Sequence, residues 1–138
     1  MNDDTCPLCL GKDEIVLWQG AQCRVLLTPQ SGYPAFCRVI WQTHVREMSD
    51  LSAGQREHFM EVVWAVEESL RSVLHPDKVN LASLGNQVPH LHWHVIPRFS
   101  DDAHFPDAIW AAPRREGVEH PINHEKLAQA LRERLPEA

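Results

Sequence analysis

The sequence predicts a single domain that combines short β-strands with α-helices. Five segments are rich in β-branched and aromatic residues, which is typical of short strands. One long and one short segment instead carry apolar residues at helical spacing. A chain of 138 residues is long enough for one compact core and contains no internal repeat, so we expect one domain over residues 1–138.

The first three strands are expected in the N-terminal third of the chain. Residues 14–18 and 22–27 are β-prone, and the three residues between them resemble a hairpin connection with a central glycine. Residues 28–34 (TPQSGYP) are dense in Pro, Gly and Ser, which predicts a loop. Residues 36–42 (FCRVIWQ) then predict the third strand.

Two helices are expected from the spacing of apolar residues. Ser52 followed by Gln55 fits a capping box, and apolar residues then recur at helical spacing until His75 and Pro76 end the pattern. Near the C-terminus, residues 123–135 predict a short helix. The apolar positions of the two helices, which we expect to be buried, are Phe59, Val62, Val63, Val66, Leu70, Val73, Leu127, Leu131 and Leu135.

The last two strands are expected at residues 78–84 and 91–97, with a tight segment at 85–89 between them. Such an arrangement favours an antiparallel hairpin. Residues 100–119 are acidic, contain Pro and have no periodicity, so we expect an irregular arm there rather than a second domain.

Three histidines stand at alternate positions in this last strand segment. His90, His92 and His94 alternate with Leu91, Trp93 and Val95, and the period of two in a strand places all three imidazoles on one face. Buried imidazole nitrogens need polar partners, so three of them in register indicate a ligand or metal site rather than ordinary core.

Composition limits the classes of function. The formal net charge of −6 argues against a sequence-independent nucleic-acid binder, which needs many basic contacts to phosphates. We find no apolar run long enough to span a bilayer, and the start of the chain is acidic rather than leader-like. We therefore expect a cytoplasmic protein that binds neither nucleic acid nor membrane. Its cysteines are expected to be thiols or metal ligands, with Cys23 and Cys37 buried in strands.

Residues 84–98 (LGNQVPHLHWHVIPR) closely resemble the signature of the histidine triad (HIT) superfamily. The resemblance extends to Asn80, to residues 38–44 (RVIWQTH) and to the order of elements, over a core of about residues 6–110. It implies an α+β, HIT-like fold with a five-stranded antiparallel sheet, one long helix and a short C-terminal helix, usually paired as a homodimer.

The resemblance also implies a nucleotide hydrolase that cleaves phosphoester, phosphoanhydride or phosphoramidate bonds at the α-phosphate through a covalent nucleotidyl-histidine intermediate. Its ligand would be a purine nucleotide, a nucleoside phosphoramidate or a dinucleoside polyphosphate. His92 matches the family's nucleophile, because a neutral imidazole nitrogen can attack phosphorus and later leave. Its other nitrogen is expected to donate to a carbonyl of a neighbouring strand. His94 is expected to bind phosphate and stabilise the transition state. The family's phosphate contacts map to Asn80, Asn86 and Gln87, and no metal is required for catalysis.

Cys6-Pro7-Leu8-Cys9 has the spacing of a zinc knuckle. Branches of the superfamily complete such a set with the residues that match His44 and His90, which implies a structural zinc site with two Cys and two His ligands. A shell of four protein ligands leaves no position for an activated water. The alternative is that Cys6 and Cys9 are free thiols or a redox pair.

Other interpretations stay open at this point. The chain could be a nucleotidyltransferase of the same superfamily, or a zinc-stabilised nucleotide-binding protein with vestigial activity. A metal oxygenase of the cupin type could use the three histidines as ligands, but the chain lacks the short Gly-punctuated strands of a jelly roll. Arg98 could contact phosphate or form an exposed ion pair with Asp101 or Asp102. The loop at residues 28–33 lies where the family commonly has an acidic residue against the ribose, and this chain has Thr28, Gln30 and Ser31 there instead.

Overall fold

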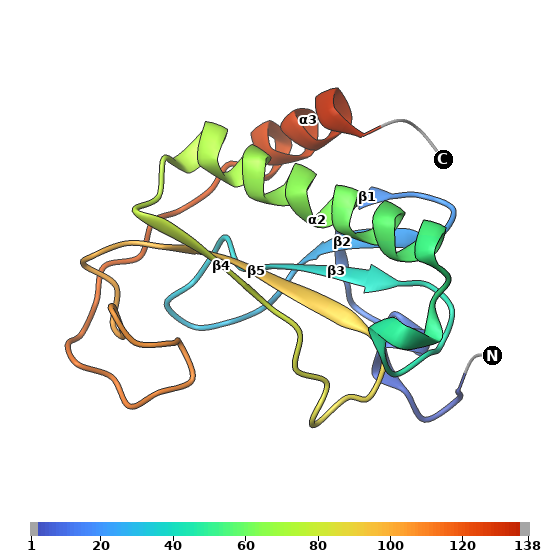
Figure 1. The fold of residues 1–138 in the computed structure, drawn as a ribbon. Helices are drawn as coiled ribbons and strands as arrows, with labels where there is room; N and C mark the ends of the chain where they lie inside the picture. Colours follow the sequence, from blue (N-terminus) through green and yellow to red (C-terminus); the bar gives the residue numbers. More distant parts are fainter. Residues whose placement is uncertain (1–2, 136–138) are drawn as a thin grey trace.

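The structure, a computed structural model, describes residues 3–135 and contains one five-stranded sheet with two helices on one face (Figure 1). The strand order is β1-β2-β3-β5-β4, and every neighbouring pair is antiparallel. This confirms the α+β fold. The elements are α1 (Pro7–Leu10), β1 (Ile15–Gln19), β2 (Cys23–Leu27), β3 (Cys37–Trp41), the 3-10 turn η1 (Met48–Asp50), α2 (Ala53–Leu74), β4 (Lys78–Ala82), β5 (His92–Arg98) and α3 (His124–Arg134).

Each predicted strand and helix is present within a few residues of its expected bounds. The capping box of α2 forms as expected: the amide of Gln55 donates to the Ser52 side chain, and the Gln55 side chain accepts from the Ser52 amide. The helix ends where His75 turns to a positive φ of 51°. The short elements α1 and η1 were not predicted, because four or three residues are too few to establish a periodicity.

The main core lies between the sheet and the helices. Side chains at odd positions of the central strands point to this layer, and the ring centroids of Trp41 on β3 and Phe59 on α2 are 5.3 Å apart. Leu91 and Val95 are buried in the same layer, as the alternation predicted. Cys23 and Cys37 are fully buried there, and burial raises the pKa of each thiol to about 12, so both stay protonated.

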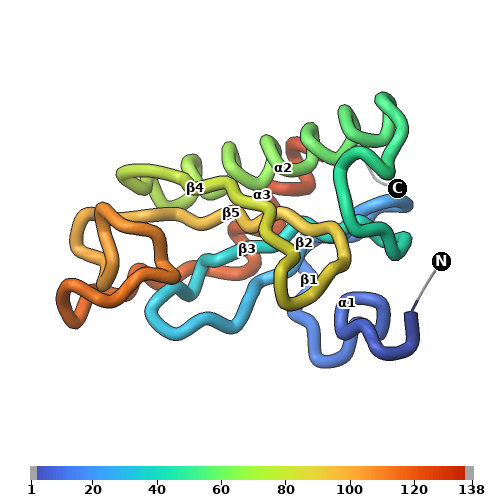
Figure 2. The backbone as a smooth tube through the Cα atoms, turned by 60° about the horizontal axis from the view of Figure 1, so that its bottom comes forward, coloured from blue at the N-terminus to red at the C-terminus, as the bar shows by residue number. Residues whose placement is uncertain are grey.

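The opposite face of the sheet carries even-numbered side chains and is flanked by two smaller apolar clusters. These clusters are Cys6, Leu8, Leu26 and Ile40, and Tyr33, Phe36, Ile96 and Ile109. The segment with α1 lies at one end of this face and the arm after β5 at the other (Figure 2). Because both even and odd positions of β2 are buried, residues outside the helices must cover part of this second face.

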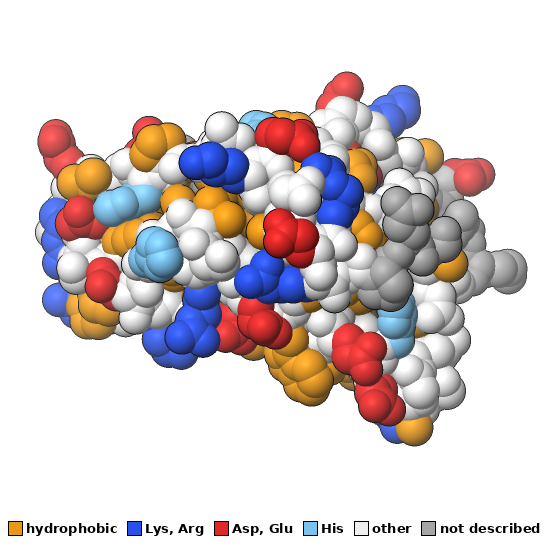
Figure 3. Space-filling model, turned by 90° about the horizontal axis from the view of Figure 1, so that it is seen from above, with side chains coloured by type: hydrophobic (Ala, Val, Ile, Leu, Met, Phe, Trp, Pro, Cys, Tyr) orange, Lys and Arg blue, Asp and Glu red, His pale blue; other side chains and the backbone are white. Residues whose placement is uncertain are grey.

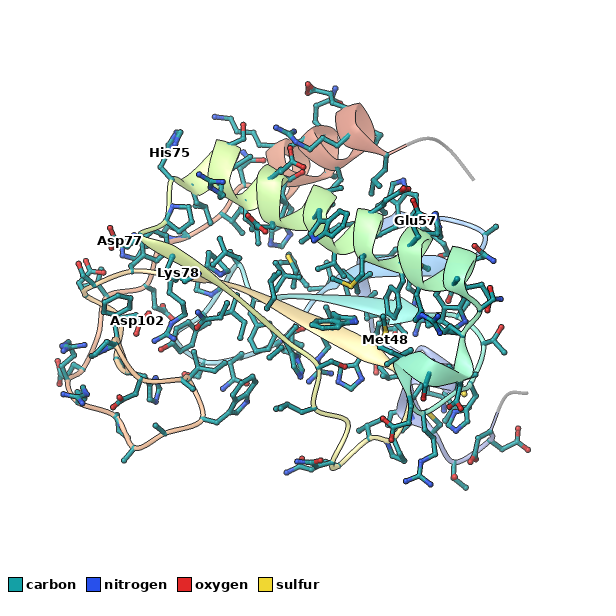
Figure 4. The ribbon with its side chains drawn as sticks, in the orientation of Figure 1. Met48, Glu57, His75, Asp77, Lys78 and Asp102 are labelled. Carbon is teal, nitrogen blue, oxygen red and sulfur yellow. The ribbon has the colours of Figure 1, made fainter. Side chains whose placement is uncertain are left out.

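A buried ion pair ties the arm after β5 to the sheet. Arg98 Nε and Asp102 Oδ2 are 2.8 Å apart, and the two side chains are only 2% and 3% exposed. The sequence left open an exposed ion pair for Arg98, and its exposure is wrong: Asp102, on the arm after β5 (Figure 4), is the partner, and both side chains are buried. Asp102 also accepts from the amides of Phe99, His104 and Phe105.

Replacement of Asp102 by Asn is expected to lower the free energy of unfolding by about 3–5 kcal/mol, since it leaves the Arg98 charge buried and unpaired. Burial alone would raise the pKa of Asp102, but Arg98 and the three amides outweigh it and hold that pKa well below its usual range. The contribution of Asp102 to the free energy of unfolding is therefore present above the pKa of about 4 that this residue has in the unfolded chain, and it is lost as the pH falls below that value. Urea unfolding of the wild type and the variant at pH 7 and pH 3 checks this. The difference between their free energies of unfolding should be smaller at pH 3, and an equal difference at both pH values would contradict the prediction.

Among residues 3–135, no helix combines the length and the apolar character that a membrane span requires.

Candidate active site and metal centre

Two cysteines and two histidines from distant parts of the chain meet beside the start of β5. Cys6 caps α1, Cys9 lies within it, His44 follows β3 and His90 precedes β5. Their ligand atoms all lie within 4.8 Å of one another. Cys9 Sγ is 3.2 Å from His44 Nδ1 and 3.4 Å from His90 Nδ1, and Cys6 Sγ is 3.4 Å from His90 Nδ1. This four-residue group can hold a metal ion.

Hydrogen bonds around the group prepare its atoms for ligation. His90 Nε2 lies 2.6 Å from the carbonyl oxygen of Trp41, so it carries the proton and leaves the Nδ1 lone pair directed at the sulfurs. Burial raises the pKa of the Cys9 thiol, and the amide of Asp3, which donates to Cys9 Sγ at 3.3 Å, partly offsets this by favouring the thiolate. Gly11, at a φ of 62°, ends α1 after one turn and so keeps both cysteines in a tight loop.

His92 is the first residue of β5, and its side chain is 5% exposed. Its Nδ1 lies 2.6 Å from the carbonyl oxygen of His90 and donates to it. The expectation of an acceptor on a neighbouring strand was wrong: the partner is two residues earlier in the same segment, because His90 precedes the regular strand and its carbonyl turns toward the ring. The bond leaves the Nε2 lone pair of His92 free.

His94 lies next to His92 on the same face of β5, with the ring centroids 4.9 Å apart. The ring also packs edge-on against Phe36 and Trp110, each at 5.3 Å between centroids. Its Nδ1 is buried and has no hydrogen-bond partner among residues 3–135. A buried imidazole nitrogen without a partner is costly, and a ligand that accepts or donates there would remove that cost.

His94 is expected to titrate far below an ordinary histidine. Burial, with the nearby charges of His92 and Arg38, lowers its pKa to about 4. The unfolded chain protonates this residue near pH 6.5, so stability is full above that pH and falls between pH 6.5 and 4, by up to about 3 kcal/mol. Histidine ring NMR, with the signal assigned through His94→Gln, should place the midpoint near 4; a midpoint near 6.5 would contradict the burial argument.

The predicted phosphate contacts, Asn80, Asn86 and Gln87, lie on β4 and on the loop between β4 and β5. Asn80 is on β4 opposite Ile96, and its Oδ1 accepts from Arg98 at 2.8 Å, which directs its amide nitrogen away from that bond. Asn86 and Gln87 are exposed on the loop between β4 and β5. No hydrogen bond joins either residue to His92 or His94 in the part of the chain that the structure describes.

Two hollows lie along the last two strands. A cleft of about 500 Å³ is lined by His92 together with Ser83, Leu84 and Gly85 of the β4–β5 loop. A larger hollow of about 860 Å³ runs along β4 and is lined by Asn80, Ala82 and Trp110 among others. Ala82 lies opposite His94 in the sheet and Trp110 packs against the His94 ring, so each hollow is bounded by the triad or by its neighbours, and each has space for a nucleotide-sized ligand.

Sequence reasoning missed one charged residue of this face, Arg38. It lies opposite His94 in the antiparallel register of β3 and β5. A signal was available: Arg38 is the single charged residue in FCRVIWQ, at a position that alternates away from the core. The sequence did not show which residue of the last strand would lie opposite Arg38.

The family model described as HIT domain matches residues 11–101. A histidine triad protein from Bradyrhizobium japonicum has a similar structure, with a TM-score of 0.72 and 28% identity over 91% of this chain and 92% of that one. One from Marinobacter aquaeolei VT8 is similar at a TM-score of 0.74 and 27% identity, over 91% and 94% of the two chains. No protein with a curated description matches the chain.

A structure from Mycobacterium smegmatis, described as a Zn-bound histidine triad family protein, shares the fold at a TM-score of 0.68 and 19% identity, over 94% of each chain. The family match covers well over half of the chain and includes His92 and His94, together with His44 and His90 of the metal group. The HIT family is the family to which this chain belongs.

Proposed function

We propose that the protein is a nucleotide hydrolase that acts at the α-phosphate through a covalent intermediate on His92. Membership of the HIT family indicates nucleotide binding in general. The observation that carries the finer proposal is the hydrogen bond from His92 Nδ1 to the carbonyl of His90. It fixes the ring and leaves Nε2 unprotonated, as a nucleophile must be.

The reaction proceeds in two displacements. His92 Nε2 attacks the α-phosphorus, a P–N bond forms, and the bond from phosphorus to the leaving oxygen or nitrogen breaks, with the leaving group taking a proton from solvent water. Water then attacks the same phosphorus, the P–N bond breaks, and the nucleoside monophosphate is released with His92 restored. Burial lowers the pKa of His92, which keeps the ring neutral and nucleophilic at pH 7.

The neighbouring polar groups bind the phosphate in this proposal. His94 lies beside His92 and donates to the phosphoryl oxygens as their charge increases. Asn80 donates through its amide nitrogen, since its Oδ1 is held by Arg98. Asn86 and Gln87 lie in the exposed loop between β4 and β5, and their positions in the signature assign them to the phosphate.

A substrate panel followed by phosphorus NMR tests the proposal. An adenosine phosphoramidate and a diadenosine polyphosphate should each release adenosine monophosphate. A third sample, with a sugar phosphate added as acceptor, tests for a nucleotidyltransferase, which would form a nucleotide sugar instead of the monophosphate. Binding of the monophosphate without turnover of any substrate would contradict the hydrolase and indicate a nucleotide-binding protein.

We propose that the metal group holds a structural zinc ion through Cys6, Cys9, His44 and His90. Two thiolate sulfurs and two imidazole nitrogens form a set that Zn²⁺ prefers, and the His90 tautomer already presents its lone pair. Zinc bound in this way would connect α1 to the start of β5. Its four positions would be filled by protein, so the chemistry stays with His92.

We also propose a homodimer. The sheet ends at β4, whose outer edge is unpaired in the part of the chain that the structure describes, and an unpaired edge is a template for a second strand. On the helical side, hydrophobic side chains are exposed between charged ones (Figure 3), and Trp64 of α2 is 49% exposed. Light scattering should give twice the mass of one chain; the mass of a single chain would contradict the dimer.

A further inference from the structure

Arg38 lies at the centre of the sheet face that carries the catalytic histidines. Its strand neighbours on that face are Phe36 and Ile40, and in register it lies opposite His94 on β5 and Leu26 on β2. The position is thus enclosed by apolar side chains on three sides and by an imidazole on the fourth. Arginine is uncommon among such apolar neighbours, which indicates a role beyond packing.

The guanidinium of Arg38 has no anionic partner in the part of the chain that the structure describes, and its Nε is buried without any hydrogen bond. The two other arginines of the sheet each have a carboxylate partner. Arg24 forms an ion pair with Glu14 at 2.8 Å, and Arg98 forms one with Asp102 at the same distance. Arg38 is half-buried, whereas Arg24 and Arg98 are buried, but its buried Nε lacks the carboxylate partner that each of them has, so the charge is open to an anion from outside the chain.

The electrostatics of the face agree with a missing anion. Burial lowers the pKa of Arg38, and the charge of Arg38 contributes to the lowered pKa of His94, which lies opposite it in the sheet. Both groups therefore disfavour positive charge on this face, and no carboxylate pairs with Arg38 among residues 3–135. A bound anion would relieve all of these effects together.

Unpartnered buried polar atoms also gather on this face. Among residues 3–135 there are four: Thr28 Oγ1, Arg38 Nε, Ser69 Oγ and His94 Nδ1. Ser69 lies on α2. Arg38 on β3 lies opposite His94 on β5, and Thr28 directly follows β2, where its amide donates to the carbonyl of Phe36. Such a cluster is the arrangement of a ligand site with its ligand removed.

We propose that Arg38 binds the 5′-phosphate of the nucleotide, and that its planar fork holds two phosphate oxygens against His92 and His94. The proposal rests on the proposed function, because it supplies the charge that brings the α-phosphate to the nucleophile. A guanidinium fits this task because it offers parallel N–H donors to two oxygens and is less strongly hydrated than an ammonium group. Arg38 is then a substrate-binding residue of the same site.

Calorimetry with adenosine monophosphate and with adenosine separates phosphate binding from nucleoside binding. Arg38→Leu should bind the monophosphate about 10- to 100-fold more weakly than the wild type, the range of one charged hydrogen-bonded contact, and adenosine equally well. Arg38→Lys keeps the charge and the aliphatic stem but loses the forked guanidinium. Its affinity for the monophosphate should therefore lie between those of the wild type and Arg38→Leu. The control is Arg132→Leu on α3, whose partners Glu125 and Gln129 are exposed, and it should change neither affinity.

Two results would overturn the inference: an unchanged monophosphate affinity in Arg38→Leu, or an equal loss for monophosphate and adenosine. If Arg38→Leu does not fold, Arg38→Lys decides by the same comparison. The outcome is distinct from that of the proposed function. A wild type that binds monophosphate through Arg38 without turning over any substrate contradicts the hydrolase alone, and a full turnover with no dependence of affinity on Arg38 contradicts this inference alone.

Discussion

Replacing His92 with Ala is expected to reduce turnover of an adenosine phosphoramidate by at least about 10³-fold, the scale of losing a covalent nucleophile. Without the imidazole no P–N bond can form, and direct attack by water lacks a group to prepare it. The fold should survive, because the side chain contributes a single hydrogen bond, to the His90 carbonyl. Acid-quenched wild-type protein should carry a nucleotidyl group on the peptide that contains His92, and the variant should carry none.

His124→Ala is the matched control for this experiment. His124 begins α3 on the exposed side of the molecule, so its loss removes one imidazole of the chain without touching the sheet face. Its turnover should equal that of the wild type. A His92→Ala variant that melts like the wild type and still turns over at a comparable rate would falsify the covalent route, whatever the fate of the substrate panel.

Removing the metal is expected to have the second largest effect. Protein purified without added zinc should contain about one zinc ion per chain, and Cys9→Ser should lose it. Because binding energy at a structural zinc site is folding energy, loss of the ion should cost several kcal/mol and lower the melting temperature by about 10 °C or more. Metal analysis and thermal unfolding of the two proteins measure this directly.

Cys23→Ala provides the control for a cysteine that lies in the core. Cys23 is fully buried on β2 among apolar side chains, so its replacement should lower stability slightly while the zinc content stays at about one per chain. Metal-free wild type from a preparation never exposed to chelator, or a Cys9→Ser variant that melts like the wild type, would contradict the structural zinc. Chelated protein that remains folded should keep the reaction, since His92 needs no metal ligand.

The sequence by itself determined the five strands, the two longer helices and the layer to which their side chains point. Phe59 and its neighbours recur at helical spacing, and Leu91 and Val95 alternate with polar residues, so α2 and the inner side of β5 followed from local periodicity. His92 and His94 were likewise recognised from alternation within one strand. These features depend on residues a few positions apart, and such spacings are a direct property of the sequence.

Only the tertiary structure decided which distant groups meet. Cys6 and His90 are 84 residues apart in sequence, and their atoms come within 3.4 Å because α1 folds back beside the start of β5. The pairing of β3 with β5 set Arg38 against His94, and the arm after β5 buried Arg98 with Asp102. Register and burial arise from packing between segments far apart in the chain, so no local pattern specifies them, and they supply the charges and carbonyls that act on the histidines.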